Sequence, residues 1–228
     1  MNRFVTQSAT GFTFVEVVIA ILIFSLVITT LFSSFQAFLR SSDAVRESIT
    51  CTEKISAVFK RMHRDIEEIY MVQPPRYKKP VSNADPDPFR LTGSEDIVGG
   101  QTVSSLIFSS SAHAKIGMDQ RNGVAQIFYY TKENDNNTLD LFRGDTLQPF
   151  AREPDGCGDP VLCTDISGFE LLYTDNDGVQ HRYWDSDSDE FAYAFPASIE
   201  IRIVLGSGDR EQVFETAISL MSQRGTVE

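Results

Sequence analysis

The sequence has few of the residues that catalysis and nucleic-acid binding need. Its three histidines, His63, His113 and His181, are scattered, with no H-x-x-x-H pair and no motif around a serine or cysteine nucleophile. Lys and Arg number 20 against 32 Asp and Glu, which gives a formal net charge of -12, whereas phosphate binding needs clustered basic residues. We therefore expect no catalytic residues, no nucleic-acid partner and no cofactor.

The sequence also lacks a complete metal-binding motif. The acidic run Asp185–Glu190 places oxygen-bearing side chains at alternating positions, as the start of an EF-hand calcium loop does. Such a loop needs a glycine at its sixth position and an acid at its twelfth, where this sequence has Glu190 and Pro196. We expect a solvated acidic loop without a metal, and Asp175–Gly178 indicates a hairpin turn.

Charge is absent from Val17 to Leu39. At ~1.5 Å per residue, a helix over this run covers roughly 30 Å, the thickness of a bilayer's hydrocarbon core. The apolar region of a cleaved secretory signal peptide has only ~7–15 residues, and here Glu16 lies at the start of a longer run. The run predicts a membrane-spanning helix, but the basic residues beside it, Arg3, Arg40 and Arg46, leave its orientation open.

A helical period continues beyond the apolar run. Apolar residues recur at three- and four-residue steps, namely Val45, Ile49, Ile55, Val58, Phe59, Met62, Ile66, Ile69 and Tyr70. Pro74 and Pro75 end this pattern. We expect one helix from Phe12 to about Met71, whose second half packs its apolar stripe on a globular domain.

A surface loop is predicted over Tyr77–Gly100, and short β-type runs follow it. They are Val103–Ser110, Ala125–Thr131, Thr138–Arg143, Gly168–Thr174, Gln180–Trp184, Ala197–Leu205 and Gln212–Leu220. No helical pattern separates them, and strands joined by short turns pair antiparallel. The sequence therefore predicts an α+β fold, in which the long helix packs on a mostly antiparallel sheet. A chain of 228 residues suits one such domain with an anchor.

A processing motif lies just before the apolar run. The polar leader Met1–Thr10 is followed by Gly11-Phe12-Thr13-Phe14-Val15-Glu16, which opens directly into the predicted helix. A glycine, then an aromatic residue, then a glutamate five positions after the glycine resembles the signature of the type IV prepilin family. Because glycine has no Cβ, the backbone at Gly11 can enter a tight protease site in an extended conformation.

This resemblance implies how the chain is processed and oriented. Prepilin peptidase would cut after Gly11 on the cytoplasmic side and N-methylate Phe12. Residues 1–11 would be the leader, 12–39 the transmembrane helix and 40–228 a periplasmic domain with a pilin-like fold that includes the outer half of the helix. Glu16 would pair with the terminal amine of Phe12 in a neighbouring subunit during assembly. The alternative is that Glu16 reaches the membrane surface and has no role.

The later part of the chain is similar to a narrower family. The J-type minor pseudopilins of the type II secretion system share patterns like Ile166–Tyr173, Asp177-Gly178, Tyr183-Trp184 and Phe195–Ile203, and also Arg61–Asp65 and Leu141–Arg143 before Asp145. This similarity implies an inner-membrane subunit that joins I- and K-type minor pseudopilins in the tip complex that initiates the pseudopilus. The alternatives are a minor pilin of a type IV pilus and, third, a membrane-tethered enzyme.

The implied topology also bears on the cysteines. Cys157 and Cys163 would lie in a loop outside the cytoplasm, where disulfides persist, so we expect a bond between them. Closing so short a loop would contribute about 2 kcal/mol in the chain-entropy account. Two cysteines without further ligands do not indicate zinc. Cys51 is then left unpaired, as a small packing residue.

Overall fold

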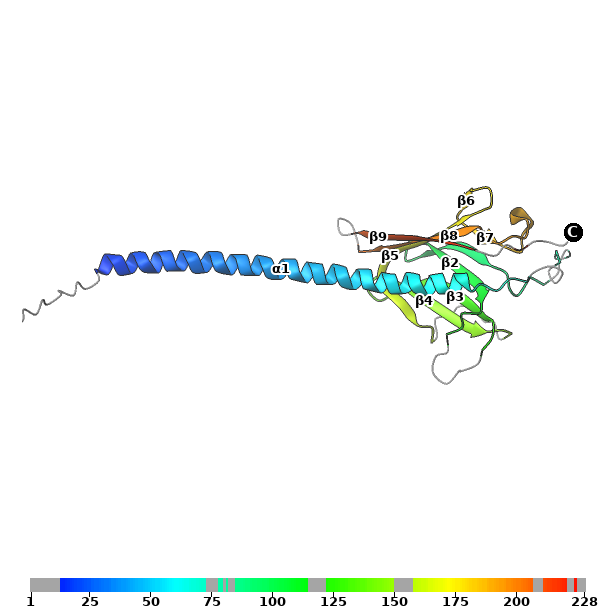
Figure 1. The fold of residues 1–228 in the computed structure, drawn as a ribbon, viewed down its shortest axis with the longest axis horizontal. Helices are drawn as coiled ribbons and strands as arrows, with labels where there is room; N and C mark the ends of the chain where they lie inside the picture. The colour runs from blue at the N-terminus through cyan, green and yellow to red at the C-terminus, as the bar shows by residue number, and fades with distance from the viewer. Residues whose placement is uncertain are drawn as a thin grey trace, which may run out of the picture. The chain divides into compact units, whose positions relative to one another are not determined.

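The computed structural model describes residues 13–72, 78–79, 81, 85–114, 122–149, 158–206, 211–220 and 224, with the backbone alone for 37 and 39–50. The chain forms two compact units, Met1–Glu53 and Lys54–Glu228. One long helix, α1 (Phe14–Glu67), supplies the described part of the first unit and enters the second (Figure 1). It begins after Thr13, whose carbonyl and hydroxyl both accept the amide of Glu16.

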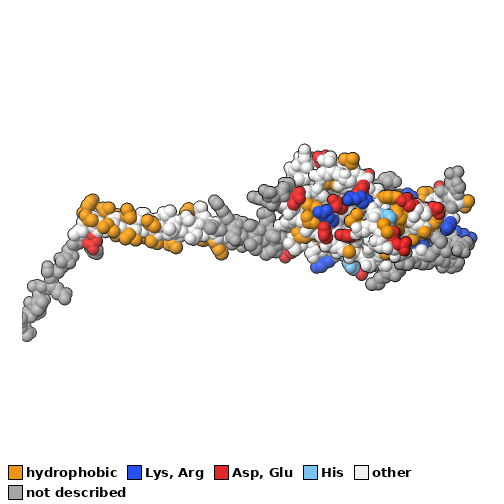
Figure 2. Space-filling model, turned by 90° about the horizontal axis from the view of Figure 1, so that it is seen from above, with side chains coloured by type: hydrophobic (Ala, Val, Ile, Leu, Met, Phe, Trp, Pro, Cys, Tyr) orange, Lys and Arg blue, Asp and Glu red, His pale blue; other side chains and the backbone are white. Residues whose placement is uncertain are grey.

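The first part of α1 is long and apolar enough to cross a membrane. This segment is Phe14–Gln36, 23 residues with a mean hydropathy of 2.7 over its most apolar window. Its side chains are exposed, and Figure 2 shows hydrophobic groups along it. The hydroxyls of Ser25, Thr29 and Thr30 donate to carbonyls three or four residues earlier, so the helix satisfies these polar groups itself.

The helix ends earlier than the sequence predicts, at Glu67 and not near Met71. Ile69 forms a β-bridge with Ser110, and the amide of Tyr70 donates to the carbonyl of Ser109. The hydroxyl of Ser110 donates to the carbonyl of Glu68 at 3.0 Å. The apolar period continues through Ile69 and Tyr70, but pairing with a strand replaces the last helical turn there.

The described residues of the second unit form a nine-stranded, antiparallel sheet (Figure 1). The strands are β1 (Thr92–Val98), β2 (Gln101–Ser110), β3 (Ala125–Glu133), β4 (Leu139–Leu147), β5 (Val161–Thr174), β6 (Gln180–His181), β7 (Trp184–Asp185), β8 (Ser198–Leu205) and β9 (Gln212–Ser219), with a 3-10 turn η1 (Asp189–Phe191) after β7. Their order is β7-β1-β2-β3-β4-β5-β8-β9, and β6 pairs with β5. This arrangement agrees with the predicted α+β class.

The sheet curls, so strands that are not neighbours in its order approach each other. The amide of Leu171 on β5 donates to the hydroxyl of Ser104 on β2 at 2.9 Å. Tyr173 on β5 lies against Gly93 on β1, where a Cβ atom would come within 1.9 Å of the tyrosine hydroxyl. Glycine is therefore required at this close approach. Side chains from strands on both sides of the curl belong to one buried cluster.

The predicted loop Tyr77–Gly100 is wrong at its end, because Thr92–Val98 forms β1. Four consecutive polar or small residues, Gly93 to Asp96, hide this strand from a hydrophobic pattern. They are tolerated because Glu95, Asp96 and Ile97 are exposed, while the strand is held by backbone pairing with β2 along its whole length. The predicted strand Gln180–Trp184 is also divided, since β6 pairs with β5 and β7 with β1.

The outer part of α1 supplies one side of the core. Ile55, Val58, Met62 and Ile66 are each at most 2% exposed and belong to the same buried cluster as residues from the strands. Their three- and four-residue spacing places them on one helical face, so this part of the predicted stripe is confirmed. Val45 and Ile49 lie where only the backbone is described. The helix is thus part of the domain's core from Ile55 onward.

Candidate functional site

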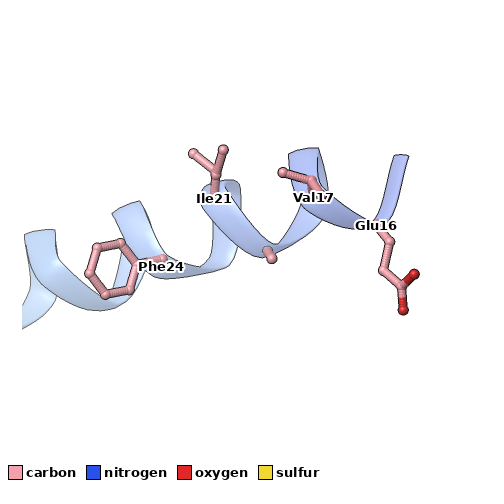
Figure 3. A pocket seen from close by; sticks show the side chains of 5 residues that line it. Glu16, Val17, Ile21 and Phe24 are labelled. Atoms are coloured by element: carbon pink, nitrogen blue, oxygen red, sulfur yellow. The ribbon is translucent and has the colours of Figure 1, made fainter. Parts of the chain in front are cut away.

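The first candidate site is the start of α1, where Glu16 is the only acid of the apolar segment. Glu16, Val17, Ala20, Ile21 and Phe24 line a shallow pocket on the helix surface (Figure 3). Their spacing of about one helical turn puts them on one face, and the small side chain of Ala20 leaves the face hollowed. The Glu16 carboxylate lies at the N-terminal end of this face and points away from Ile21 (Figure 3).

Three residues of the sequence predictions lie outside the residues that the structure describes. Gly11 and Phe12, at the expected cut, lie outside the described residues, and so does Cys157. The cleavage, the methylation and the Cys157–Cys163 bond therefore stay predictions. Cys163 itself is buried on β5. Cys51 is half-buried on α1 and has no disulfide partner among the residues that the structure describes.

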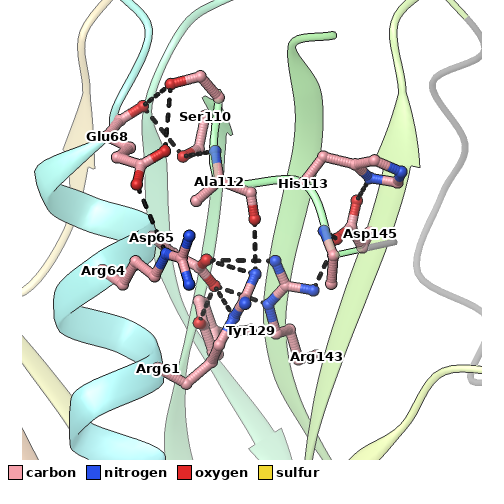
Figure 4. A network of polar contacts seen from close by, with 12 residues as sticks. Arg61, Arg64, Asp65, Glu68, Ser110, Ala112, His113, Tyr129, Arg143 and Asp145 are labelled. Atoms are coloured by element: carbon pink, nitrogen blue, oxygen red, sulfur yellow. Dashed lines mark hydrogen bonds and ion pairs between the residues drawn. The ribbon is translucent and has the colours of Figure 1, made fainter. Parts of the chain in front are cut away.

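The second candidate site is a buried polar network centred on Asp65, a fully buried residue of α1 (Figure 4). Its carboxylate accepts the hydroxyl of Tyr129 on β3 at 2.5 Å. Arg143 on β4 donates to it through Nε at 2.6 Å and Nη2 at 3.3 Å. Arg61, one turn earlier on α1, pairs with it at 2.8 Å and also donates to the carbonyl of Ala112 at 2.6 Å. Asp65 thus connects the helix to two strands.

The network extends from Arg143 to the segment that follows β2. Nη1 of Arg143 donates to Asp145 at 2.8 Å, and the other oxygen of Asp145 lies 2.6 Å from Nδ1 of His113. The amide of Ala114 also donates to Asp145, at 2.7 Å. Burial by itself would raise the pKa of Asp145, but these three hydrogen bonds and the charge of Arg143 outweigh it, so the pKa is lowered.

The protonation of Tyr129 and Arg143 is fixed by the same contacts. Burial raises the pKa of Tyr129 well above its ordinary value, and the adjacent carboxylate of Asp65 raises it further. Burial would lower the pKa of Arg143, but hydrogen bonding and charge attraction from Asp65 reverse this effect and raise the pKa. Tyr129 therefore stays neutral and donates, while Arg143 stays charged.

This network is suited to holding structure more than to chemistry. Buried Arg143 and partly exposed Arg61 face the buried carboxylates of Asp65 and Asp145, so each buried charge has an opposite charge beside it, as buried ions require. His113 with Asp145 has the geometry of an acid–base pair, and its buried Nε2 has no hydrogen-bond partner within the described residues. In the same part of the chain no hydroxyl or thiol is bonded to His113.

The other two histidines each contact a separate carboxylate. His63 lies 3.1 Å from Glu67 on the exposed side of α1, and His181 lies 3.0 Å from Asp175 beside the β5–β6 turn. That turn confirms the predicted hairpin at Asp175–Gly178, with Gly178 at φ +83°. No group of three or more potential metal ligands occurs among the residues that the structure describes.

The prediction of a solvated acidic loop at Asp185–Glu190 is wrong for its first part. Ser186 is fully buried, and the carboxylate of Asp187 accepts the amide of Asp87 at 2.9 Å. Asp189 and Glu190 are exposed, as predicted. The loop is partly buried because residues from before β1 supply donors to it, and no local pattern in Asp185–Glu190 indicates that contact.

The sequence patterns Arg61–Asp65 and Leu141–Arg143 did not predict that these two segments contact each other in one network. A signal was present. Asp65 falls between Met62 and Ile66 on the apolar stripe of the helix, and Arg143 falls on the buried side of β4 with Leu139 and Leu141. A charged residue at a core position requires an opposite charge. The sequence does not show which charge is paired with which.

No family model matches the chain, and no curated protein matches it.

Replacing Asp65 by asparagine should strongly destabilise the domain. Asparagine keeps the shape but removes the charge, which leaves Arg143 buried without its main partner. We expect the free energy of unfolding to fall by about 3 kcal/mol. Urea denaturation of the full chain in detergent measures it, with the exposed substitution Glu67→Gln as the control. A loss below about 0.5 kcal/mol, as for an ordinary surface change, would contradict the role of Asp65.

The ionisation of Asp145 should make the free energy of unfolding depend on pH in the acidic range. Its pKa is lowered in the folded chain from the ordinary value of 3.8, so its contribution is complete above that value and is lost as the pH falls towards the folded pKa. The unfolding free energy of the unaltered chain should therefore drop more steeply between roughly pH 5 and pH 2 than that of Asp145→Asn. Urea titrations across this range compare the two, and equal slopes would refute the assignment.

Proposed function

We propose that the chain is a minor pseudopilin of a type II secretion system, of the J type. It is made as a precursor, cut after Gly11, and held in the inner membrane by the first part of α1 with its C-terminal domain in the periplasm. The observation that carries the proposal is the motif Gly11–Glu16 at the start of a helix long and apolar enough to span a membrane. A helix followed by an antiparallel sheet supports it.

Glu16 has a specific task in this proposal. An acid placed deep in a membrane costs roughly 2.5–3.5 kcal/mol, so it needs a partner. The new amine of Phe12 in a neighbouring subunit carries the opposite charge and enters the same layer of the membrane. The face of Val17, Ala20, Ile21 and Phe24 next to Glu16 offers the neighbour's helix an apolar surface with a hollow. The charge pair would then set the position of the neighbour's helix along α1, and apolar packing would stabilise the contact between the two helices.

The second role in this proposal belongs to the domain, which binds partner subunits at the tip of the fibre. The proposed partners are the I- and K-type minor pseudopilins, with prepilin peptidase acting earlier. Heterologous contacts between such subunits build open helical filaments. The buried network suits this role because it fixes α1 against β3 and β4, and a subunit that is packed through its helix needs that helix held firmly.

A minor pilin of a type IV pilus carries the same motif and is the alternative. Genes for a secretion ATPase and a secretin beside this one would favour the pseudopilin, and a pilus retraction ATPase would favour the pilin. A membrane-tethered enzyme would require that the chain is not processed at Gly11.

Processing gives the most direct test of the proposal. Mass spectrometry of the membrane-extracted protein should find a chain that begins at N-methylated Phe12. Gly11→Leu should remain uncut but still inserted, because a side chain at this position obstructs the protease while the apolar segment is unchanged. Gly11→Ala, with the smallest side chain, serves as the graded control. An unmodified full-length N-terminus in the unaltered protein would overturn the proposal.

Glu16→Ala tests assembly separately from processing. The substitution lies beyond the cut, so cleavage should be normal. Incorporation into the fibre should fall on the order of tenfold, equivalent to ~1.4 kcal/mol of lost pairing. Thr29→Ala is the matched control, because the hydroxyl of Thr29 is bonded within its own helix, to the carbonyl of Ser25. Normal incorporation of Glu16→Ala would rule out the amine–carboxylate pairing for this subunit.

A further inference from the structure

Arg224, near the C-terminus, lies with its side chain fully buried between two loops. Its Nη1 donates to the carboxylate of Asp87 at 2.5 Å, and its Nε donates to the carbonyl of Tyr193 at 3.0 Å. Nη2 donates to the carbonyl of Ser186. The guanidinium also lies over the ring of Phe195, 5.0 Å from its centroid. Each of its three nitrogens thus has an acceptor, and one face of the plane has an aromatic ring.

The pocket around Arg224 is built by contacts that do not involve the arginine. The amide of Phe89 donates to one oxygen of Asp87 and leaves the other for Arg224. Ser186 is joined to Leu91 twice, because its hydroxyl accepts the amide of Leu91 at 2.8 Å and its own amide donates to the Leu91 carbonyl at 2.9 Å. The carboxylate and the Ser186 carbonyl are therefore held in place by the two loops themselves.

The turn after η1 contributes a third fixed acceptor. Ala192 and Tyr193 lie at φ +49° and +57°, a conformation that residues other than glycine seldom adopt. The amide of Tyr193 donates to the carbonyl of Ser188, which holds the turn closed while the Tyr193 carbonyl faces Arg224. Residues in such uncommon backbone conformations cluster at ligand clamps and switch regions.

These acceptors match a guanidinium group in particular. A guanidinium is planar, donates in several fixed directions and stacks on aromatic rings, whereas an ammonium is a compact point charge without a plane. The carboxylate of Asp87 supplies the opposite charge that a buried cation requires. Lysine in the same place would have its three donors on a single nitrogen and no planar group to cover the ring of Phe195.

We propose that these loops form a guanidinium-binding pocket, that the chain fills it with its own Arg224, and that Arg224 adds a further link between residues 185–195 and residues 85–91, beside the contacts of Ser186 with Leu91 and of Asp187 with Asp87. The ligand class is an alkylguanidinium, the end of an arginine side chain. This inference does not depend on the proposed function. Leu220, buried after β9, donates to the carbonyl of Ala197, so the tether to Arg224 is short. A short tether gives an effective concentration on the order of millimolar, which keeps the site filled.

The only tryptophan of the chain reports on this pocket. Trp184 is 2% exposed, and its ring nitrogen donates to the carbonyl of Ala194 at 2.9 Å. It stacks on Phe191 of η1, with ring centroids 4.1 Å apart. Without Arg224 the turn at Tyr193 loses its link to Asp87, so the cover of this ring loosens, its emission shifts to the red and acrylamide quenches it more strongly. The signal is local and does not require the domain to unfold.

The test uses the full chain in detergent, with Arg224→Ala as the variant and Arg202→Ala as the matched control. Arg202 pairs with Glu170 and Glu215 on the surface of the sheet, away from the pocket's contacts. We expect Arg224→Ala to shift the Trp184 emission and to lower the Tm by roughly 4–8 °C. Ethylguanidinium at a concentration on the order of millimolar should reverse both effects, saturably, and ethylammonium should not.

If ethylguanidinium restores Arg224→Ala no better than ethylammonium does, or changes Arg202→Ala equally, the pocket is not a guanidinium site. If Arg224→Ala does not fold, Arg224→Lys decides the question, because it keeps the charge and loses the planar donors. Its Trp184 quenching should be clearly stronger than that of the unaltered chain. Quenching equal to the unaltered chain would show that any cation suffices, and the proposal would fail.

Discussion

The carboxylate of Asp65 is the group on which the arrangement of the domain depends. It is withdrawn from water on the core side of α1, and a buried charge is stable only where opposite charge and hydrogen bonds replace the water. Arg143 supplies them from β4, and Arg143 in turn requires Asp145. A single acid on the helix therefore constrains two strands and the segment after β2, because each partner brings a charge that needs another partner.

The contacts of Asp65 fix the orientation of α1, which apolar packing alone does not fix. Ile55, Val58, Met62 and Ile66 bury their surface against the strands, but hydrophobic attraction has no preferred direction. Hydrogen bonds are directional, so the contacts of Asp65 fix the rotation of α1 and its position along its own axis. The apolar stripe packs the helix on the sheet, and the polar network fixes the position of the helix there.

Local patterns predicted most of the fold, and pairs of distant residues account for what they missed. The membrane-length apolar helix, the apolar stripe and most strands follow from periodicity, because each residue's environment repeats along its own element. β1 was missed because its middle is polar and exposed, and only its pairing with β2 makes it a strand. The contacts of Asp65 with Arg143, and of Asp87 with Arg224, join residues far apart in the sequence. Charge at a core position shows that a partner exists but does not identify it.

The division of Gln180–Asp185 between two strands has a consequence for folding. β6 extends the hairpin from β5, whereas β7 pairs with β1, so Asp185 meets Thr92 from the other half of the chain. Closing so long a loop costs more entropy than closing a hairpin, and contacts of this kind form late. As the chain leaves the ribosome N-terminus first, Thr92 and Gly93 on the outer edge of β1 lack this partner until Trp184 and Asp185 have emerged. The exposed charges of Glu95 and Asp96 lie further along the same edge, which no other described strand covers, and a charged edge resists association with other chains.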